Sequence, residues 1–342
     1  MSSAVDYLIV GGGLTGRLLQ LELMKRSLNA VVYDTIDENH STQVAAGLVN
    51  PIVGKYFTVG WRAQDYFPPL AGFYQNLEKQ LDATFFSPQL MKRIIASAGE
   101  QNLWLSKAHL EKYSPFCTFH QEEIQGIQTS YGVLHVHHAG VLDTREFLRA
   151  CTAKLTTINE RFEYDQLDVA QRKYKDVSFQ KIVFCEGYKS VHNPFFQKLD
   201  IIVPTKGEML EINAEGIPDE CTYLGPVFIQ PIGPNTWRVG ATYEQNQTTL
   251  EPTLQMHEHL IDRFKKIATV PFDIKRQYCG IRPASKDRKP ILGRHPSIDA
   301  IYFMNGMGSK AISMVPLLAS EMADFMEHNL PLPPEVDLRR FC

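Results

Sequence analysis

Three glycines near the amino terminus have the spacing that binds a dinucleotide. Gly11, Gly13 and Gly16 follow the β-rich run 5–10 and precede a leucine-rich stretch that predicts a helix. The first glycine permits a tight turn, the second lets a pyrophosphate approach the backbone, and the third lets helix and strand pack closely. Asp34 ends a second predicted strand 18 residues after Gly16. An acid there binds ribose hydroxyls and disfavours the 2′-phosphate of NADP.

Three later segments are expected to face the same ligand. A predicted strand ends at Cys185, and ligands bind at the carboxyl ends of parallel strands, so residues 185–188 are candidates. The glycine turn 305–309 would aim a second helix N-terminus at the other end of the dinucleotide. A polar stretch, 37–41, leads into 42–51, whose small residues suit a backbone packed against a flat ligand. A loop that simply enters a helix is the alternative for 42–51.

Histidines and cysteines do not form a recognisable metal pattern. His135 and His137 would share one face of a strand, but no third ligand stands at a plausible position, so a solvated strand face is favoured over a metal site. The six cysteines are scattered, without a C-x-x-C pair. This usage is typical of a reduced, cytosolic protein rather than a disulfide framework or a zinc site.

Composition excludes several function classes. With 35 Lys and Arg against 38 Asp and Glu, the net charge is −3, which does not favour DNA binding. No run reaches the ~18 apolar residues of a membrane helix, and the amino terminus lacks a basic leader region. We therefore expect a cytoplasmic protein without an integral membrane segment. The oligomeric state is open.

The candidate residues are positioned by helices and strands that alternate irregularly. Helices are predicted at 62–81, at 250–268 and after Ser309 to about His328, and another follows the N-cap Asp143 or Thr144. In the last helix, Pro316 must lie in the first turn or introduce a kink. Residues 279–294 combine glycines, prolines and charges, which predicts one loop.

The order of these elements predicts an α/β protein with two interleaved domains. Residues 201–245 are rich in strands and turns, which indicates an antiparallel sheet inserted into a mononucleotide-binding chain. The predicted domains are a discontinuous Rossmann-type FAD-binding domain (1–60, 140–200 and 275–342) and a mainly antiparallel-sheet substrate-binding domain (61–139 and 201–274).

Eight stretches together resemble the D-amino-acid-oxidase-like family of FAD-dependent oxidoreductases, which includes glycine and sarcosine oxidases. The most specific, Gly280-Ile-Arg-Pro-Ala-Ser-Lys-Asp-Arg-Lys-Pro-Ile-Leu-Gly293, is close to the glycine oxidase pattern G-x-R-P-x-x-x-D-x-x-P-x-x-G. The resemblance implies FAD rather than NAD. The eight stretches occur in the family's order and are 10–16, 42–51, 140–148, 184–187, 204–207, 239–243, 280–293 and 306–316.

Two departures from the family's patterns bear on the substrate and the cofactor. Gly306-Met-Gly-Ser-Lys-Ala311 differs from Gly-His-Phe-Arg-Asn-Gly of glycine oxidase and is nearer to the oxidase domain of the bifunctional tRNA-modifying enzyme. The cysteine that holds flavin covalently in the sarcosine oxidase branch corresponds to Gly280, and Cys279 is one residue away. We therefore expect noncovalent FAD.

The resemblance also implies roles for individual residues. Arg282 would clamp a substrate carboxylate, and its alternative is a structural arginine. Lys310 would add charge near the flavin or bind the carboxylate, and its alternative is solvent exposure. Tyr243 would line the substrate pocket, or lie in the core. The residues expected to bind the cofactor are Gly11, Gly13, Leu14, Thr15, Gly16, Asp34, Thr42, Gln43, Ala46, Gly47, Leu48, Cys185, Glu186, Gly187, Gly280, Arg282, Gly306, Met307, Gly308, Ser309 and Lys310.

The implied activity is oxidation of the C–N bond of a small amino acid or amine by hydride transfer to the flavin. Such chemistry needs a held substrate and a neutral amine rather than a strong catalytic base. Molecular oxygen would accept the electrons and form peroxide. The alternatives are an FAD-dependent oxidase of a modified tRNA uridine side chain and a dehydrogenase with another electron acceptor.

Overall fold

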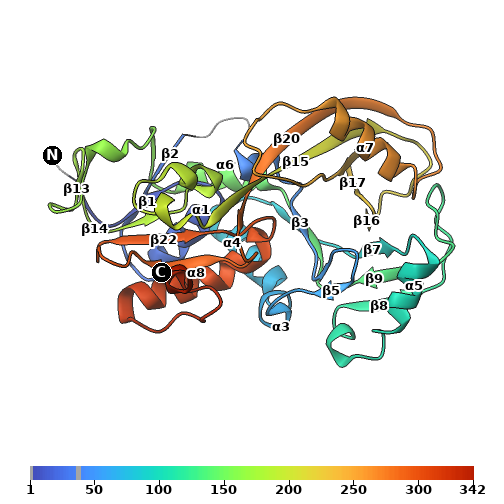
Figure 1. Ribbon diagram of the computed structural model, residues 1–342, viewed down its shortest axis with the longest axis horizontal. Coiled ribbons are helices and arrows are strands. Elements are labelled where there is room, and N and C mark those ends of the chain that lie inside the picture. The colour runs from blue at the N-terminus through green and yellow to red at the C-terminus, as the bar shows by residue number, and fades with distance from the viewer. Residues whose placement is uncertain (1–2, 36–39) are drawn as a thin grey trace.

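A computed structural model describes residues 3–35 and 40–342 of the protein. Most of the polar stretch expected at 37–41 lies outside the described residues. Most of the strands form two large sheets side by side, and the carboxyl terminus lies beside the first (Figure 1). Among the described residues, no helix has the length and apolar character that crossing a bilayer requires.

A mainly parallel sheet forms around the amino-terminal strand (Figure 1, left). β1 pairs in parallel with β2 and β14, and β14 pairs in parallel with β22. The central strands are apolar on both faces because both faces are covered. The strands of this sheet are β1 (Ser3–Val10), β2 (Ala30–Asp34), β11 (Thr157–Asn159), β12 (Leu167–Asp168), β13 (Lys173–Tyr174), β14 (Val177–Phe184), β21 (Ile291–Arg294) and β22 (Ile301–Asn305).

Helices of the same half pack into one apolar core with this sheet. The predicted helix at 62–81 is divided by Pro68 and Pro69, because proline ends or starts a helix more readily than it continues one. Asp143 caps the next helix by accepting hydrogen bonds from the amides of Arg145 and Glu146. These helices are α1 (Leu14–Lys25), α3 (Ala63–Tyr66), α4 (Leu70–Leu81), α6 (Thr144–Lys154) and α8 (Ala311–His328).

The second large sheet is mainly antiparallel and curves beside the first (Figure 1, right). α7 (Leu254–Phe264) packs against β15 and β18 through Leu260 and Phe264. Side chains alternate along β15, so Leu210 and Ile212 belong to this core while Gly207 and Met209 face the opposite side. The strands are β7 (Met91–Ile94), β8 (Cys117–His120), β9 (Val133–Val136), β15 (Ile202–Asn213), β16 (Thr222–Leu224), β17 (Phe228–Gly233), β18 (Thr236–Gly240), β19 (Glu244–Gln245) and β20 (Asp273–Ser285).

The loop predicted for residues 279–294 is wrong. This segment continues β20 to Ser285, turns, and forms β21. β20 pairs only with β15 among the described strands, and an edge position tolerates Pro283, which has no amide proton to donate. The mixed composition therefore reflects an edge strand and a tight turn rather than an irregular loop.

Pro316 is the sixth residue of α8, so it lies beyond the first turn.

The remaining elements are short connections at the surface and between the sheets. The six cysteines are all free thiols. The short elements are α2 (Ser41–Val44), α5 (Ala98–Leu105), β3 (Leu48–Val49), β4 (Ile52–Val53), β5 (Thr58–Val59), β6 (Phe86–Pro88), β10 (Gly140–Leu142), η1 (Glu111–Tyr113), η2 (Tyr164–Gln166), η3 (Gly187–His192), η4 (Gln197–Leu199) and η5 (Leu338–Phe341).

Candidate active site

A cavity of about 750 Å³ lies where the two sheets face each other. One end is lined by the glycine loop after β1 and by the end of β14. The middle is lined by residues 44–48 and by the start of α8, and the other wall comes from β15, β17 and β20. The cavity therefore extends from the carboxyl ends of the parallel strands, where nucleotides bind in such sheets, to the wall of the antiparallel sheet.

The glycine loop shapes the first end of the cavity. Gly11 has φ +104°, and a Cβ there would lie 2.5 Å from the Cys185 carbonyl oxygen, so only glycine fits. Gly13, which precedes α1, provides no side-chain cap. The Leu14 amide donates to Thr42 Oγ1 at 3.1 Å. The other amides of the first turn are thus available to a phosphate.

Asp34 has the geometry of a ribose-binding acid. It lines the cavity at the end of β2, and its Oδ2 atom is buried without a hydrogen-bond partner in the described part of the chain. The His40 ring is loosely placed beside it, with Nε2 4.0 Å from Oδ2. A buried carboxylate oxygen needs a donor, and a ribose hydroxyl would supply one.

Glu186 lies beside the glycine loop and is held by two donors. The Tyr164 hydroxyl donates to Oε1, and the Asn193 side-chain amide donates to Oε2 at 2.7 Å. Burial raises the pKa of Glu186 to about 7, against the opposing effect of these two hydrogen bonds. Cys185 next to it has a thiol pKa raised by burial, so it is a neutral wall of the cavity rather than a nucleophile.

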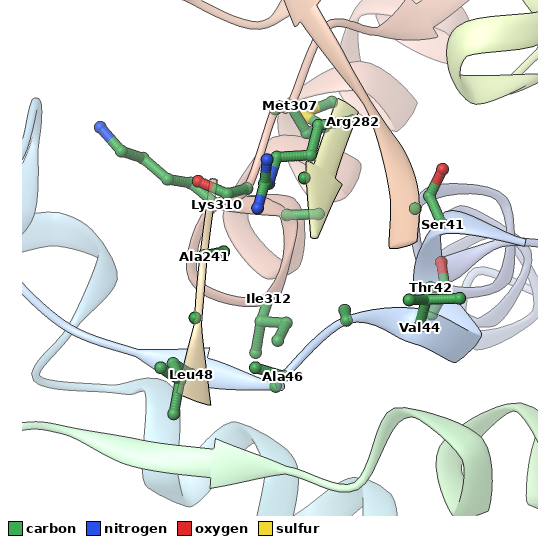
Figure 2. Close-up of a pocket in the computed structure, with 18 of the residues that line it drawn as sticks. Ser41, Thr42, Val44, Ala46, Leu48, Ala241, Arg282, Met307, Lys310 and Ile312 are labelled. Atoms are coloured by element: carbon green, nitrogen blue, oxygen red, sulfur yellow. The ribbon is translucent and has the colours of Figure 1, made fainter. Parts of the chain in front are cut away.

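The middle of the cavity suits a flat ring. In Figure 2, Arg282 and Lys310 lie on one side of this space, while Ala46 and Leu48 lie on the other. Small side chains and Gly47 keep the lower wall close to the backbone. Ile312 at the start of α8 also lines the space, so the positive end of that helix is directed at it.

Arg282 presents an unpaired guanidinium to this space. It lies in β20 opposite Thr205 of β15, and its guanidinium reaches Gly207 two residues further along that strand, where a Cβ would be 2.1 Å from Arg282 Nη1. Nη1 donates to the Thr242 carbonyl at 3.1 Å, and the Tyr243 ring lies 4.2 Å from the guanidinium carbon. No acidic side chain of the described residues forms an ion pair with Arg282. The remaining donors are available to a ligand carboxylate.

Tyr243 and Lys310 both lie at the opening of the cavity. Tyr243 is 65% exposed, so the alternative of a core tyrosine is wrong. Its hydroxyl donates a long, 3.5 Å hydrogen bond to Ser309 Oγ. Lys310 precedes α8, and desolvation lowers the pKa of its ammonium group. A cation at this place would favour an anionic ligand beside it.

Nearly all of the predicted binding residues line the cavity. The exceptions are Gly16, Gln43 and Gly306. Gly16 faces the strand, because a Cβ there would lie 1.9 Å from the Gly11 carbonyl oxygen, and the Gln43 carbonyl accepts a hydrogen bond from Arg145. The lining residues from the predicted set are Gly11, Gly13, Leu14, Thr15, Asp34, Thr42, Ala46, Gly47, Leu48, Cys185, Glu186, Gly187, Tyr243, Gly280, Arg282, Met307, Gly308, Ser309 and Lys310.

Several lining residues have no motif that could have revealed them. They come from separate segments in both halves of the fold, and only the fold brings them together. His40 and Ser41 stand just before a predicted segment, but their types alone carry little information. The charged and polar residues missed in this way are His40, Ser41, Lys55, Arg93, Glu100, Thr144, Lys189, Arg263, Lys266 and Ser313.

β20 is fastened to segments on the dinucleotide side of the cavity. The Ser41 hydroxyl donates to the Ile281 carbonyl at 2.5 Å, and the Gly308 amide donates to the Pro283 carbonyl at 2.9 Å. Arg282 lies between these two attachments. Its position relative to a bound dinucleotide is therefore set by hydrogen bonds to the β20 backbone on both sides.

The predicted histidine cluster lies away from this cavity. His135 Nε2 is 2.7 Å from Glu122 Oε1, and the His120 ring stacks on His135 with 3.8 Å between centroids. His137 contacts Thr118. In residues 3–35 and 40–342, no group of three potential ligands is placed to hold a metal ion.

Several features of the cavity lining fit FAD. The orphaned Asp34 oxygen, the uncapped start of α1 and the glycine loop match an adenosine diphosphate moiety, and the space between Ala46 and Arg282 matches a ring system. A two-sheet fold with such a site defines a dinucleotide-dependent enzyme with its substrate region between the sheets.

Comparison with known proteins agrees with this class. The family described as FAD dependent oxidoreductase (DAO) matches residues 6–325. The chain belongs to this family and is therefore an FAD-dependent enzyme. It is similar to glycine oxidase from Bacillus subtilis strain 168, with 29% identity over 95% of this chain and 94% of that protein. Glycine oxidase from Bacillus licheniformis shows 23% identity over 96% and 95% of the two chains.

Solved structures share the fold at low sequence identity. Glycine oxidase from Geobacillus kaustophilus superposes with a TM-score of 0.80 and 16% identity, covering 99% of this chain and 98% of the other. L-proline dehydrogenase from P. horikoshii gives 0.77 and 14%, covering 100% and 98%. The bifunctional tRNA protein MnmC of Marinobacter nauticus matches at 26% identity over only 42% of this chain and 25% of its own length.

Proposed function

We propose that this FAD-dependent oxidoreductase oxidises the C–N bond of a small amino acid or amine, with oxygen as the electron acceptor. Bound FAD would supply the hydride acceptor. The single observation that carries the proposal is Arg282. Its guanidinium has no acidic partner in the described residues and lies beside the part of the cavity that suits a flat ring. Relatives named glycine oxidase along the whole chain support it.

The chain's own residues would bind and orient the substrate. Arg282 would hold the carboxylate through two parallel hydrogen bonds, which fixes the α-carbon against the flat ligand. Tyr243 and Lys310 would border the entrance. The described lining offers no acid–base pair beside Arg282, and none is needed when the amine arrives neutral. Asp34 and the first turn of α1 would hold the nucleotide half of the cofactor.

Noncovalent attachment of FAD is part of the proposal. Cys279 is 1% exposed and does not line the cavity. Its Sγ atom donates to the Leu250 carbonyl at 3.0 Å, on the opposite side of β20 from Gly280. Denaturation should therefore release free FAD, whereas flavin that stays with the precipitated chain would contradict noncovalent binding.

A peroxide-coupled assay of the purified yellow protein tests the activity. The panel comprises glycine, sarcosine, proline and other small amino acids as both enantiomers. We expect peroxide with at least one of them. Reduction of the flavin without peroxide under air would overturn oxygen as the acceptor, and a flavin that no panel member reduces anaerobically would overturn the amino-acid class itself.

A further inference from the structure

Basic side chains gather in the cavity beside β7 and β16, away from the glycine loop. We call Lys55, Arg93, Arg263 and Lys266 the basic end. Glu100 is the one acid lining this region among the described residues. The whole chain carries more acidic than basic residues, with a net charge of −3, so the excess of cations here is local and not a consequence of composition.

Arg93 is buried with weak polar partners, and its guanidinium carbon lies 5.3 Å from the centroid of the Phe57 ring. The residue is 9% exposed, and its Nε atom is buried with no hydrogen-bond partner in the described part of the chain. Nη1 donates to the Gly225 carbonyl at 3.3 Å, and Nη2 is 4.0 Å from Glu100 Oε2. Burying a cation with such distant partners costs free energy, and an anion bound at this position would reduce that cost.

The neighbouring charges do not compensate Arg93. Glu100 Oε2 accepts from the Ala96 amide at 3.1 Å and so belongs to the cap of α5, where Ser97 accepts from the Glu100 amide. Arg263 donates to the Pro226 carbonyl at 3.3 Å. Within residues 3–35 and 40–342, neither Arg263 nor the two lysines of the basic end form an ion pair. This end of the cavity is thus prepared for negative charge.

The basic end is far from Arg282. Arg93 lies in β7 and Arg282 in β20, and the strands between them are β16, β17, β18 and β15. Five strand spacings of about 4.8 Å give roughly 24 Å along a flat sheet, and curvature shortens the direct path. A molecule that contacts both places must be much longer than glycine.

We propose that the basic end binds an anionic group, carboxylate or phosphate, of an extended substrate whose amine is oxidised beside Arg282. The position of the oxidised amine rests on the proposed function. The anion site rests only on Arg93 and its basic neighbours. The favoured substrates are accordingly amines or amino acids that carry a second negative charge at a distance.

Binding of inorganic tripolyphosphate to the FAD-loaded enzyme tests this proposal, because FAD then occupies the glycine loop. Titration calorimetry at low and high salt should show binding that weakens with salt. Arg93→Gln and Lys266→Gln should each weaken it about tenfold, which corresponds to one charged hydrogen bond. Lys265→Gln is the matched control, since Lys265 is also exposed and adjacent but does not line the cavity.

The outcomes separate the two proposals. No tripolyphosphate binding, or equal affinity in the wild type and both cavity variants, would overturn the basic end even if amino acids are oxidised. Binding that only the cavity variants lose would support the basic end even if no amino acid in the panel is turned over. Lys266→Gln changes an exposed side chain, so it keeps the test valid if Arg93→Gln fails to fold.

Discussion

The Tyr74 hydroxyl donates a 2.8 Å hydrogen bond to the carbonyl oxygen of Ile312, although the two residues are 238 positions apart. In α8, the carbonyl of Ile312 would normally accept from the amide of residue 316, which is a proline and has none. Tyr74 is fully buried, so water cannot replace it. A side chain of α4 thus completes the helix whose first turn lines the cavity.

Tyr74→Phe should lower the free energy of unfolding by about 1–3 kcal/mol, the cost of leaving a buried carbonyl unpaired. Urea unfolding of the FAD-loaded protein measures this change. Pro316→Ala restores an amide donor, so in that background the same Tyr74→Phe substitution should cost clearly less. Equal costs in both backgrounds would show that the hydroxyl does not act through the missing amide.

Asp34→Ala should raise the dissociation constant of FAD about tenfold to a hundredfold, because hydrogen bonds to a charged group are lost. The apoprotein should be no less stable, since the variant removes a buried oxygen without a partner in the described residues. Fluorescence titration of FAD and thermal melting of the apoprotein give the two readouts. Asp299→Ala is the control, as this side chain is 85% exposed. Unchanged FAD affinity would leave Asp34 with a structural role only.

Gly207→Ala should impair binding of carboxylate substrates while every charge is retained. The added methyl group would lie 2.1 Å from Arg282 Nη1 and must displace the guanidinium. We expect kcat/KM for the carboxylate substrate to fall about as much as in Arg282→Ala. In both variants the loss of transition-state stabilisation should be about 2–4 kcal/mol. An amine without a carboxylate should be affected much less by either change.

Gly72→Ala is the control for that experiment, because a Cβ at Gly72 meets nothing within 4 Å. It should bind and turn over the carboxylate substrate as the wild type does. If Gly207→Ala also behaves as the wild type, Arg282 does not hold the carboxylate from the position seen here.

Glu186 should make stability depend on pH. Its pKa in the folded protein is raised to about 7 by burial, whereas in the unfolded chain it titrates near 4.5. The folded state therefore holds its proton more tightly, so its contribution to stability is greatest below pH 4.5 and declines as the pH rises to about 7. The loss is at most about 3 kcal/mol.

Glu186→Gln should remove this decline, and its single amide oxygen can still accept from the Asn193 amide while its NH2 group donates to the Tyr164 hydroxyl. Urea unfolding of the apoprotein between pH 5 and pH 8 measures the difference between the two proteins. Parallel stability curves across that range would mean that Glu186 does not titrate there.

The order of strand, glycine loop, helix and acid at the amino terminus was predictable, because backbone geometry demands those residue types at those positions. For α6 the sequence indicated Asp143 or Thr144 as the N-cap, and the structure shows that it is Asp143. β20 was mistaken for a loop, because glycine and proline usually interrupt strands. Here Gly280 pairs with Gly207 and Pro283 with Pro204, so both strands carry these residues side by side at a sheet edge.

The basic end could not be predicted from the sequence. Arg93, Arg263 and Lys266 come from a strand, a helix and the turn after that helix, and each looks like an ordinary surface charge in its own segment. The length of the cavity was equally hidden, because it depends on how the two sheets face each other. The binding residues could therefore be predicted where they belong to one local motif. They could not be predicted where segments far apart in the sequence contribute single residues to one region of the cavity.

Because β20 is attached through Ser41 and Gly308, the two walls of the cavity should differ in how much sequence change they tolerate. Arg282, where a carboxylate would be held, is fixed to the cofactor side by these two hydrogen bonds. Insertions or substitutions in this segment would therefore misalign the reacting atoms. In the part of the chain that the structure describes, no hydrogen bond joins the opposite wall, beside β7 and β16, to β20. Changes in that wall can alter which molecules are accepted and leave the reaction geometry intact, so we expect substrate range to diverge there first among related enzymes.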